Sequence, residues 1–263
     1  MKYDAGRAAS FYDEYGEREW TRFDDGRTPA ASLATHTHYL ERFVSSGDRV
    51  LDTGCGPGRF TLELARLGAQ VVAADISPGQ LELHRNYTTT VGSAVEDRVV
   101  ADVLSLPFED DAFDVTVCYG GAVSYLLDLA PAAVAELTRV TRPEGHVLIS
   151  VMSLVGSLIW GLDTVLDVAR EKGIDAVDRV NATGVLTPEL GAHGLTMKMY
   201  RWRELRELLA PHGEIVAACA TGLVKNTPDE PELRELTERI ELDVGAEPGA
   251  IDMGHHMLAV VRV

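Results

Sequence analysis

The chain has 263 residues, of which 46% are apolar, and a formal net charge of −17. This length can bury a full hydrophobic core and favours one domain with a cap over two independent domains. The acidic charge and the lack of a basic run argue against a nucleic-acid partner. No run reaches the ~18–20 apolar residues that span a bilayer, and the N-terminal segment lacks the apolar core of a signal peptide, so we expect a cytoplasmic protein with no membrane partner.

Two helices are predicted before the first strand. Pro29 after Thr28 opens the second of them, where Leu33, His36, Leu40 and Phe43 recur at i, i+3, i+7 and i+10. The first lies within residues 8–23 and has aromatic residues at spacings of three and four. The residues that fall near one side of this helix are Phe11, Tyr12, Tyr15, Glu19 and Trp20.

The stretch VLDTGCGPG at residues 50–58 has the order strand, tight glycine turn, helix. Its apolar run ends at Asp52, and Gly54, Gly56 and Gly58 then alternate with other residues. Glycines at this spacing allow backbone conformations closed to other residues and leave no Cβ to hold a ligand away from the main chain. The turn therefore suits a nucleoside-bearing cofactor, with a plain strand-to-helix connection as the alternative. The spacing GxGxG, instead of GxGxxG, gives little reason to expect a pyrophosphate.

Three further strand patterns follow this turn. QVVAAD ends at Asp75, RVVAD ends at Asp102, and FDVTVCYGG follows from residue 113. An acidic residue at the tip of the second strand is where a ribose diol is usually held. Acids at successive strand ends therefore predict one binding site at this edge of a parallel sheet, although each alone also suits a helix cap or a turn.

Taken in order, these segments resemble the motifs of class I S-adenosylmethionine-dependent methyltransferases, of the small-molecule type similar to methyltransferase domains 11 and 25. The motifs are DxGxGxG, an acid after the second strand, ADxxxLPF from Ala101 and FDV before the fourth strand. The resemblance covers residues 50–151 well and the rest loosely. It implies an enzyme with a Rossmann-like α/β fold: a seven-stranded, mostly parallel sheet with an antiparallel last strand. It also implies S-adenosyl-L-methionine as the cofactor.

The expected organisation is a single class I methyltransferase domain over residues 1–263. Residues 1–46 are predicted as a helical lid, 47–152 as the cofactor-binding core, 153–200 as an inserted cap and 201–263 as the C-terminal part of the core. Apolar residues at helical spacing predict one amphipathic helix at the start of the cap. A long, irregular loop follows, which favours a role in acceptor specificity. The alternatives are packing of this helix on the sheet edge or a dimer contact.

The resemblance assigns cofactor-binding roles to individual residues. Asp52 would orient the glycine turn and help hold the amino group of the cofactor, directly or through water. Asp75 would accept the ribose hydroxyls, and Asp102 would accept the adenine amine. The complete cofactor-binding set is Tyr15, Asp52, Gly54, Cys55, Gly56, Gly58, Asp75, Ile76, Asp102, Val103, Tyr119 and Gly120.

Acceptor and catalytic residues carry no motif of their own. Methyl transfer from a sulfonium needs alignment and exclusion of water, so a general base is optional. The candidate bases are Tyr125, His36, His38 and His255, and the residues expected around the acceptor are Tyr12, Trp20, Tyr125, Trp160 and Tyr200. The lid aromatics have the alternative of seating their helix on the core. We predict His84 at the surface or the edge of the core.

No metal site is expected, because the three cysteines are far apart without a CxxC motif and neighbouring histidines on a strand point to opposite faces. The expected function is methyl transfer by in-line displacement to an oxygen or nitrogen of a small-molecule acceptor, such as a natural product, by a monomer or homodimer. Two alternatives stay open: a nicotinamide-dependent oxidoreductase and a catalytically inactive cofactor-binding protein.

Overall fold

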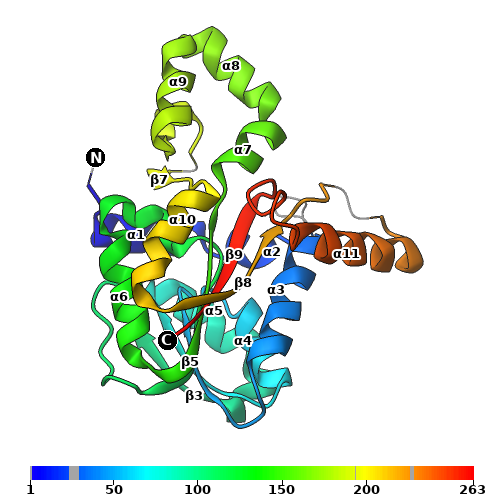
Figure 1. Cartoon of the computed structure of the whole chain (residues 1–263). Helices are drawn as coiled ribbons and strands as arrows, with labels where there is room; N and C mark the ends of the chain where they lie inside the picture. The colour runs from blue at the N-terminus through cyan, green and yellow to red at the C-terminus, as the bar shows by residue number, and fades with distance from the viewer. Residues whose placement is uncertain (1, 24–29, 193, 226–227) are drawn as a thin grey trace.

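A seven-stranded sheet forms the centre of the computed structural model, which describes residues 2–23, 30–192, 194–225 and 228–263 (Figure 1). The strand order is β3-β2-β1-β4-β5-β9-β8. β9 runs antiparallel to both of its neighbours, and the other pairs are parallel. The predicted mostly parallel sheet with an antiparallel last strand is therefore confirmed. The strands are β1 (Arg49–Thr53), β2 (Gln70–Asp75), β3 (Val95–Val100), β4 (Phe113–Cys118), β5 (Thr141–Met152), β8 (Glu214–Thr221) and β9 (His256–Arg262).

Helices cover both faces of the sheet (Figure 1). α3 and α4 pack on one face, and α6 and α10 pack on the other. Pro29, the predicted start of the second helix, lies outside the described residues. The helices are α1 (Ala5–Tyr15), α2 (Arg18–Thr21), α3 (Ala30–Phe43), α4 (Arg59–Arg66), α5 (Pro78–Tyr87), α6 (Ala130–Val140), α7 (Leu154–Trp160), α8 (Leu162–Lys172), α9 (Ile174–Thr183), α10 (Trp202–Leu209) and α11 (Pro231–Gly245), with 3-10 segments η1 (Thr89–Ala94), η2 (Ala122–Leu129), η3 (Pro188–Leu190) and η4 (Ala210–His212).

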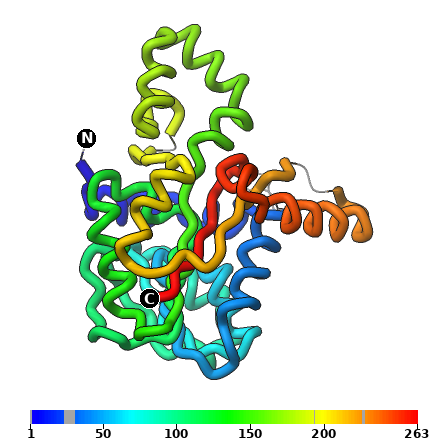
Figure 2. Tube along the Cα trace, in the orientation of Figure 1, coloured from blue at the N-terminus to red at the C-terminus, as the bar shows by residue number. Residues whose placement is uncertain are grey.

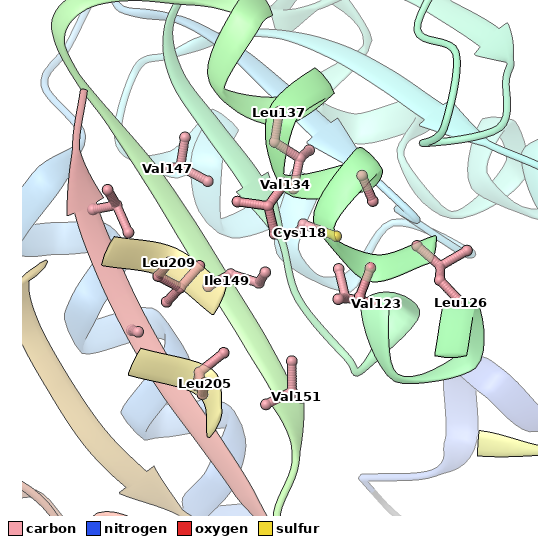
Figure 3. Packing of buried hydrophobic residues seen from close by; sticks show 14 of the residues in the cluster. Cys118, Val123, Leu126, Val134, Leu137, Val147, Ile149, Val151, Leu205 and Leu209 are labelled. Atoms are coloured by element: carbon pink, nitrogen blue, oxygen red, sulfur yellow. The ribbon is translucent and has the colours of Figure 1, made fainter. Parts of the chain in front are cut away.

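Side-chain alternation along β5 explains the two-sided core. Val147, Ile149 and Val151 face α6 and α10, whereas Leu148 joins the cluster on the opposite face (Figure 3). Successive residues of a strand point to opposite faces, so a parallel sheet covered on both sides needs a continuous apolar run. The sequence VLISV at 147–151 nearly meets this requirement; the one polar residue, Ser150, is buried and accepts the Gly120 N–H.

The binding edge of the sheet lies where the strand order reverses. β1 pairs with β2 on one side and with β4 on the other, so the chain turns in opposite directions after β1 and after β4. Ligands of open α/β sheets bind at such a point, beyond the carboxyl ends of the strands. The two turns come close together here, because a Cβ built on Gly54 would lie 3.1 Å from the Cβ of Ala122.

The segment after β5 differs from the single amphipathic helix that its periodicity predicts. It forms α7, α8 and α9, which are separated at Gly161 and Gly173, followed by a short hairpin of β6 (Val185–Leu186) and β7 (Met197–Lys198). α8 and α9 extend away from the sheet (Figure 2). Leu162 and Leu166 of α8 are 54% and 43% exposed, so they do not seat this helix on the sheet. The division of the chain into lid, core and cap stays a prediction.

Within the described ranges, the helices are too short or too polar to cross a lipid bilayer.

Candidate functional site

A cavity that is partly open to solvent lies at the carboxyl ends of β1, β2, β3 and β4. Its floor comes from the turns that follow these four strands. Its cover comes from the N-terminal segment, including α1, α2 and the residues after α2, and from η2. The predicted cofactor-binding residues that line it are Gly54, Cys55, Gly56, Asp75, Ile76, Asp102, Val103, Tyr119 and Gly120.

The glycine turn after β1 presents its backbone to this cavity. Gly54, Gly56 and Gly58 have φ values of 66°, 51° and 96°, a region that residues with a side chain rarely adopt. The Gly56 N–H donates a hydrogen bond of 2.8 Å to Asp75 Oδ2. The carboxylate after β2 therefore holds the turn after β1 in place.

Asp75 is almost completely buried, at 7% exposure. The Ser77 N–H donates to Oδ1 over 2.8 Å, while Oδ2 accepts the Gly56 N–H. Burial raises the pKa of Asp75 to about 6, although these two backbone hydrogen bonds lower it. A carboxylate oxygen has two lone pairs, so each oxygen keeps capacity for a ligand hydroxyl.

Asp102 lies at the same edge, after β3. Its Oδ1 accepts the Leu104 N–H over 3.0 Å, and its Oδ2 accepts the Tyr3 hydroxyl over 2.9 Å. Burial, together with this carboxylate, raises the pKa of Tyr3 well above its usual value. The contact ties the N-terminal segment to the end of β3 and so closes one side of the cavity.

Asp52 occupies a different place from the other two carboxylates. It is 1% exposed and lies outside the cavity lining formed by the described residues. Its Oδ2 accepts the Thr61 hydroxyl over 2.6 Å, which links the end of β1 to α4 beneath the glycine turn. Burial, with a further contribution from the charge of Asp75, raises the pKa of Asp52 to about 7.

His84 extends this support under the turn. Arg98 Nε donates to His84 Nδ1 over 3.0 Å, so Nε2 carries the hydrogen and donates to Thr61 Oγ1 over 2.9 Å. Thr61 in turn donates to Asp52, which makes a directed chain of hydrogen bonds from Arg98 to Asp52. His84 is completely buried. His84 therefore does not lie at the surface, one of the two positions predicted for it; its partner Arg98 lies on another element and leaves no local signal.

Gly58 packs directly against this support. A Cβ at Gly58 would lie 2.7 Å from Thr88 Cγ2 and 2.9 Å from His84 Cδ2. We expect Gly58→Ala to lower the free energy of unfolding by about 2 kcal/mol, because it adds backbone strain to overpacking. Urea unfolding measures this loss.

Gly47→Ala is the matched control. Gly47 has a nearly equal φ of 92°, but no described atom lies within 4 Å of an added Cβ. It should lose only the strain, about 1 kcal/mol. Equal losses in the two variants would contradict the contact between Gly58 and the support beneath the turn.

Two tyrosines that the sequence places near the acceptor line the cavity together. Tyr12 of α1 and Tyr125 of η2 make an edge contact, with ring centroids 6.1 Å apart. Burial and the hydrogen bond to Tyr125 raise the pKa of Tyr12 well above its usual value. Burial likewise raises the pKa of Tyr125. Both phenols are therefore neutral at pH 7.

An ion pair that sequence reasoning did not single out also lines the cavity. Arg22 Nε lies 3.0 Å from Glu19 Oε1, and the side chains are 17% and 18% exposed. The sequence signal for this pair was a glutamate and an arginine three residues apart, among the aromatic residues of the predicted lid. That signal is weak, because such pairs are common on solvated helices.

The other predicted lid residues lie outside the cavity lining that the described chain forms. Tyr15 stacks on Phe11, with ring centroids 5.6 Å apart. Trp20 stacks on Tyr87 at 4.1 Å, and the Arg59 guanidinium lies 4.2 Å from the centre of the Trp20 ring. Both residues contact neighbouring side chains of the lid or of α4 and α5. Gly58 likewise lies beneath the turn instead of at the cavity.

Two aromatic residues of the predicted cap were expected around the acceptor. Neither belongs to the cavity lining that the described residues form. Trp160 ends α7, and its ring lies 5.9 Å from that of His255. Tyr200 is 3% exposed and belongs to the core cluster between β5 and α10. Their roles at the acceptor stay predictions.

The structure does not bring the four candidate bases together. Tyr125 lines the cavity. His36 is buried beside Tyr119, donates from Nδ1 to the Ser32 carbonyl over 2.7 Å, and burial lowers its pKa to about 4. His255 also has a pKa lowered to about 4 by burial, and its ring lies 4.6 Å from that of His256. His38 lines a separate hollow between α3 and α11.

Similarities to known proteins agree with this geometry. The methyltransferase-domain family matches residues 51–149. The malonyl-[acyl-carrier protein] O-methyltransferase of Serratia marcescens is 37% identical over 112 residues, which cover 43% of the chain and 41% of that protein. Methyltransferase GfsG of Streptomyces halstedii is 28% identical over 223 residues, 70% of the chain and 78% of that protein. Against several other curated relatives, the chain spans about half of the relative's length.

The fold matches solved methyltransferase structures over its whole length. An S-adenosylmethionine-dependent methyltransferase of Thermotoga maritima superposes with a TM-score of 0.61 and 15% identity, over 96% of the chain and 98% of that structure. At this identity the likeness shows the fold alone. Together with the motifs, it supports the resemblance: residues 51–149 match the methyltransferase-domain family, and the chain has the fold of the class I S-adenosylmethionine-dependent methyltransferases, which implies S-adenosylmethionine as the cofactor.

Proposed function

We propose that the protein transfers the methyl group of S-adenosylmethionine to an oxygen or nitrogen atom of a small-molecule acceptor. The observation that carries this proposal is the cavity itself, where Asp75 and Asp102 meet the open backbone of Gly54 and Gly56. Carboxylates suit ribose hydroxyls and the exocyclic amine of adenine, and a bare glycine turn allows a ligand to approach the main chain.

The residues at the cavity fit the cofactor. Asp75 would accept the ribose hydroxyls, and Ile76 beside it would pack on the adenine. Asp102 would accept the adenine amine, with the Val103 N–H as donor to a ring nitrogen. Asp52 would act through the glycine turn, because the Thr61 hydroxyl already occupies its Oδ2 and it lies outside the cavity lining of the described chain.

The cofactor, when bound, supplies a methyl group that is already activated on a sulfonium. The contribution of the chain is alignment of the acceptor and exclusion of water, which together lower the barrier by up to ~7–11 kcal/mol. Phe23, Tyr12 and Tyr125 provide aromatic walls for this purpose. Because burial raises the pKa of Tyr125, its neutral hydroxyl orients an acceptor by hydrogen bonding and does not take up its proton.

The name of one relative supports oxygen as one acceptor class. The Serratia protein is an O-methyltransferase by name, although the matched part is less than half of that protein. The strongly acidic chain, with a net charge of −17, favours neutral or cationic metabolites over anionic polymers. We therefore place phenols, alcohols and amines first among the candidate acceptors.

A radiolabelled methyl-transfer assay over panels of phenols, alcohols, amines and carboxylic acids tests the proposal. We expect a labelled small-molecule product with the wild type and little with an Asp75→Ala, Asp102→Ala double variant. Calorimetry with S-adenosylmethionine accompanies the assay. Binding without transfer to any acceptor class would favour the inactive cofactor-binding alternative, and the lack of binding would contradict the proposed function.

A further inference from the structure

The ion pair of Glu19 and Arg22 lies inside the cofactor cavity. Both side chains belong to the cavity lining, and each is less than one-fifth exposed. Ion pairs on the surface contribute little to stability. Charges that are as buried as these two interact strongly with a ligand that enters the cavity beside them. A ligand that fills the cavity therefore contacts both charges.

The pair bridges the two turns on either side of the topological switch. A Cβ at Gly56, after β1, would lie 3.4 Å from Glu19 Cγ. A Cβ at Gly120, after β4, would lie 2.9 Å from Arg22 Nη2. Gly120 has a φ of 78°, and its N–H donates to Ser150 Oγ over 2.9 Å, so this close approach is built into the turn.

The negative charge of Glu19 acts on the rest of the cavity. It contributes to the raised pKa of Asp75, after the larger effect of burial. It does the same for Tyr12 and Tyr125. Glu19 and these three residues line the same cavity, and the carboxylate also contacts Arg22.

A carboxylate for the amino group of the cofactor is otherwise missing from the described lining at this end. The sequence assigns that role to Asp52, but Asp52 lies beneath the turn with Thr61 on its Oδ2. An α-amino acid end carries one ammonium and one carboxylate. Glu19 and Arg22 offer the complementary charges at one place.

We propose that Glu19 and Arg22 form the subsite for the zwitterionic amino-acid end of the cofactor, with Glu19 binding the ammonium and Arg22 binding the carboxylate. This assignment rests on the proposed function, because it presupposes S-adenosylmethionine in the cavity. Before the cofactor binds, the two side chains pair with each other within one segment, and on binding each exchanges this partner for the opposite charge of the ligand. A guanidinium presents paired N–H donors to a carboxylate, which explains an arginine at this position.

Two nucleosides that differ only at this end provide the test. S-adenosylhomocysteine has the amino-acid end, and 5′-methylthioadenosine lacks it. We expect wild-type protein to bind the first more tightly in calorimetry. Glu19→Ala and Arg22→Ala should each weaken binding of S-adenosylhomocysteine by roughly 10- to 100-fold and change binding of 5′-methylthioadenosine by less than about threefold.

A matched control and two further variants separate charge from folding. Arg170→Ala removes the arginine of an i, i+3 pair with Asp167 on α8, where the side chains are 71% and 66% exposed, and should change neither affinity. Arg22→Lys should recover part of the lost affinity. The double variant Glu19→Arg, Arg22→Glu keeps one positive and one negative charge but exchanges their positions. It should no longer bind S-adenosylhomocysteine tightly and should still bind 5′-methylthioadenosine.

The outcomes distinguish this subsite from the proposed function. If the wild type binds S-adenosylhomocysteine but Arg22→Ala lowers the affinity for both nucleosides equally, or for neither, the subsite assignment is wrong and the proposed function stands. A wild type that binds neither nucleoside overturns both. Loss of preference for S-adenosylhomocysteine in the two alanine variants, with 5′-methylthioadenosine still bound, supports the assignment.

Discussion

We expect Asp75→Ala to weaken binding of S-adenosylmethionine by about 3 kcal/mol, roughly 150-fold, at pH 8. Two effects combine in this variant. The ligand hydroxyls lose a charged acceptor, and the Gly56 and Ser77 N–H groups lose the carboxylate that holds the turn in place. Calorimetric titration of the purified protein measures the change. The pH matters, because Asp75 has a pKa of about 6 and is ionised at pH 8.

The control is Asp163→Ala, which removes an exposed carboxylate of α8 and should leave the affinity unchanged. Asp75→Asn adds a second comparison. Its amide has one acceptor oxygen and one NH₂ group, so it satisfies only one of the two backbone donors and should lie between the wild type and the alanine variant. If Asp75→Ala keeps its fold and its affinity for S-adenosylmethionine stays within twofold of the wild-type value, Asp75 is not part of the binding site.

The cofactor edge of the sheet was predictable because its signals are local. Gly54, Gly56 and Gly58 follow an apolar run at once, and Asp75 and Asp102 each end a strand within a few residues of the buried segment. Strand ends in a parallel sheet share one edge, so their order in the chain is sufficient to bring them together. The strand order and the register then confirm the sheet.

Contacts between distant residues leave no signal in the local sequence. Asp52 ends the apolar run that comes directly before the glycine turn. Only the position of Thr61 on α4 shows that the Asp52 carboxylate points beneath the turn. His84 has apolar neighbours in the sequence, and its partner Arg98 comes from β3. Neither the direction of a side chain at a strand end nor a hydrogen bond between elements can be read from periodicity.

The lid and the cap differ from expectation for related reasons. Spacings of three and four predict the helices before β1, but which aromatic residue reaches the cavity depends on how α1 sits: Tyr12 reaches it, and Tyr15 lies against Phe11. In the cap, the apolar stripe continues through Gly161 although the helix ends at Trp160. Periodicity predicts which residues share a face and does not locate a break at a single glycine.

We expect Asp52→Asn to raise the free energy of unfolding at pH 8 by about 4 kcal/mol and to have little effect at pH 4. The pKa of Asp52 rises from 3.8 to about 7 on folding, chiefly through burial. Because this pKa is higher in the folded protein than in the unfolded chain, protonated Asp52 favours the folded state below the pKa of the unfolded chain. That contribution to the free energy of unfolding is lost as the pH rises through the pKa of the folded protein. Ionised Asp52 therefore destabilises the folded protein above pH 7. Urea unfolding at several pH values between 4 and 8 measures this effect.

Asparagine keeps the shape of the side chain and an oxygen that can accept the Thr61 hydroxyl, so the variant mainly removes the charge. Asp163→Asn removes an exposed charge instead and should leave the pH dependence unchanged. Equal pH dependence in the wild type and Asp52→Asn would contradict a raised pKa for the buried carboxylate.

The same variant separates support of the turn from contact with the cofactor. Because Asp52 lies outside the described cavity lining, Asp52→Asn should weaken binding of S-adenosylmethionine at pH 8 far less than Asp75→Ala does. An equal loss would show that Asp52 contacts the ligand when the cavity is filled, and the assignment of the ammonium to Glu19 would then need the charge-reversal variant to support it. A more stable protein with nearly unchanged affinity would mean that Asp52 supports the turn through its hydrogen bond to Thr61 and that its charge does not contribute to binding of the cofactor.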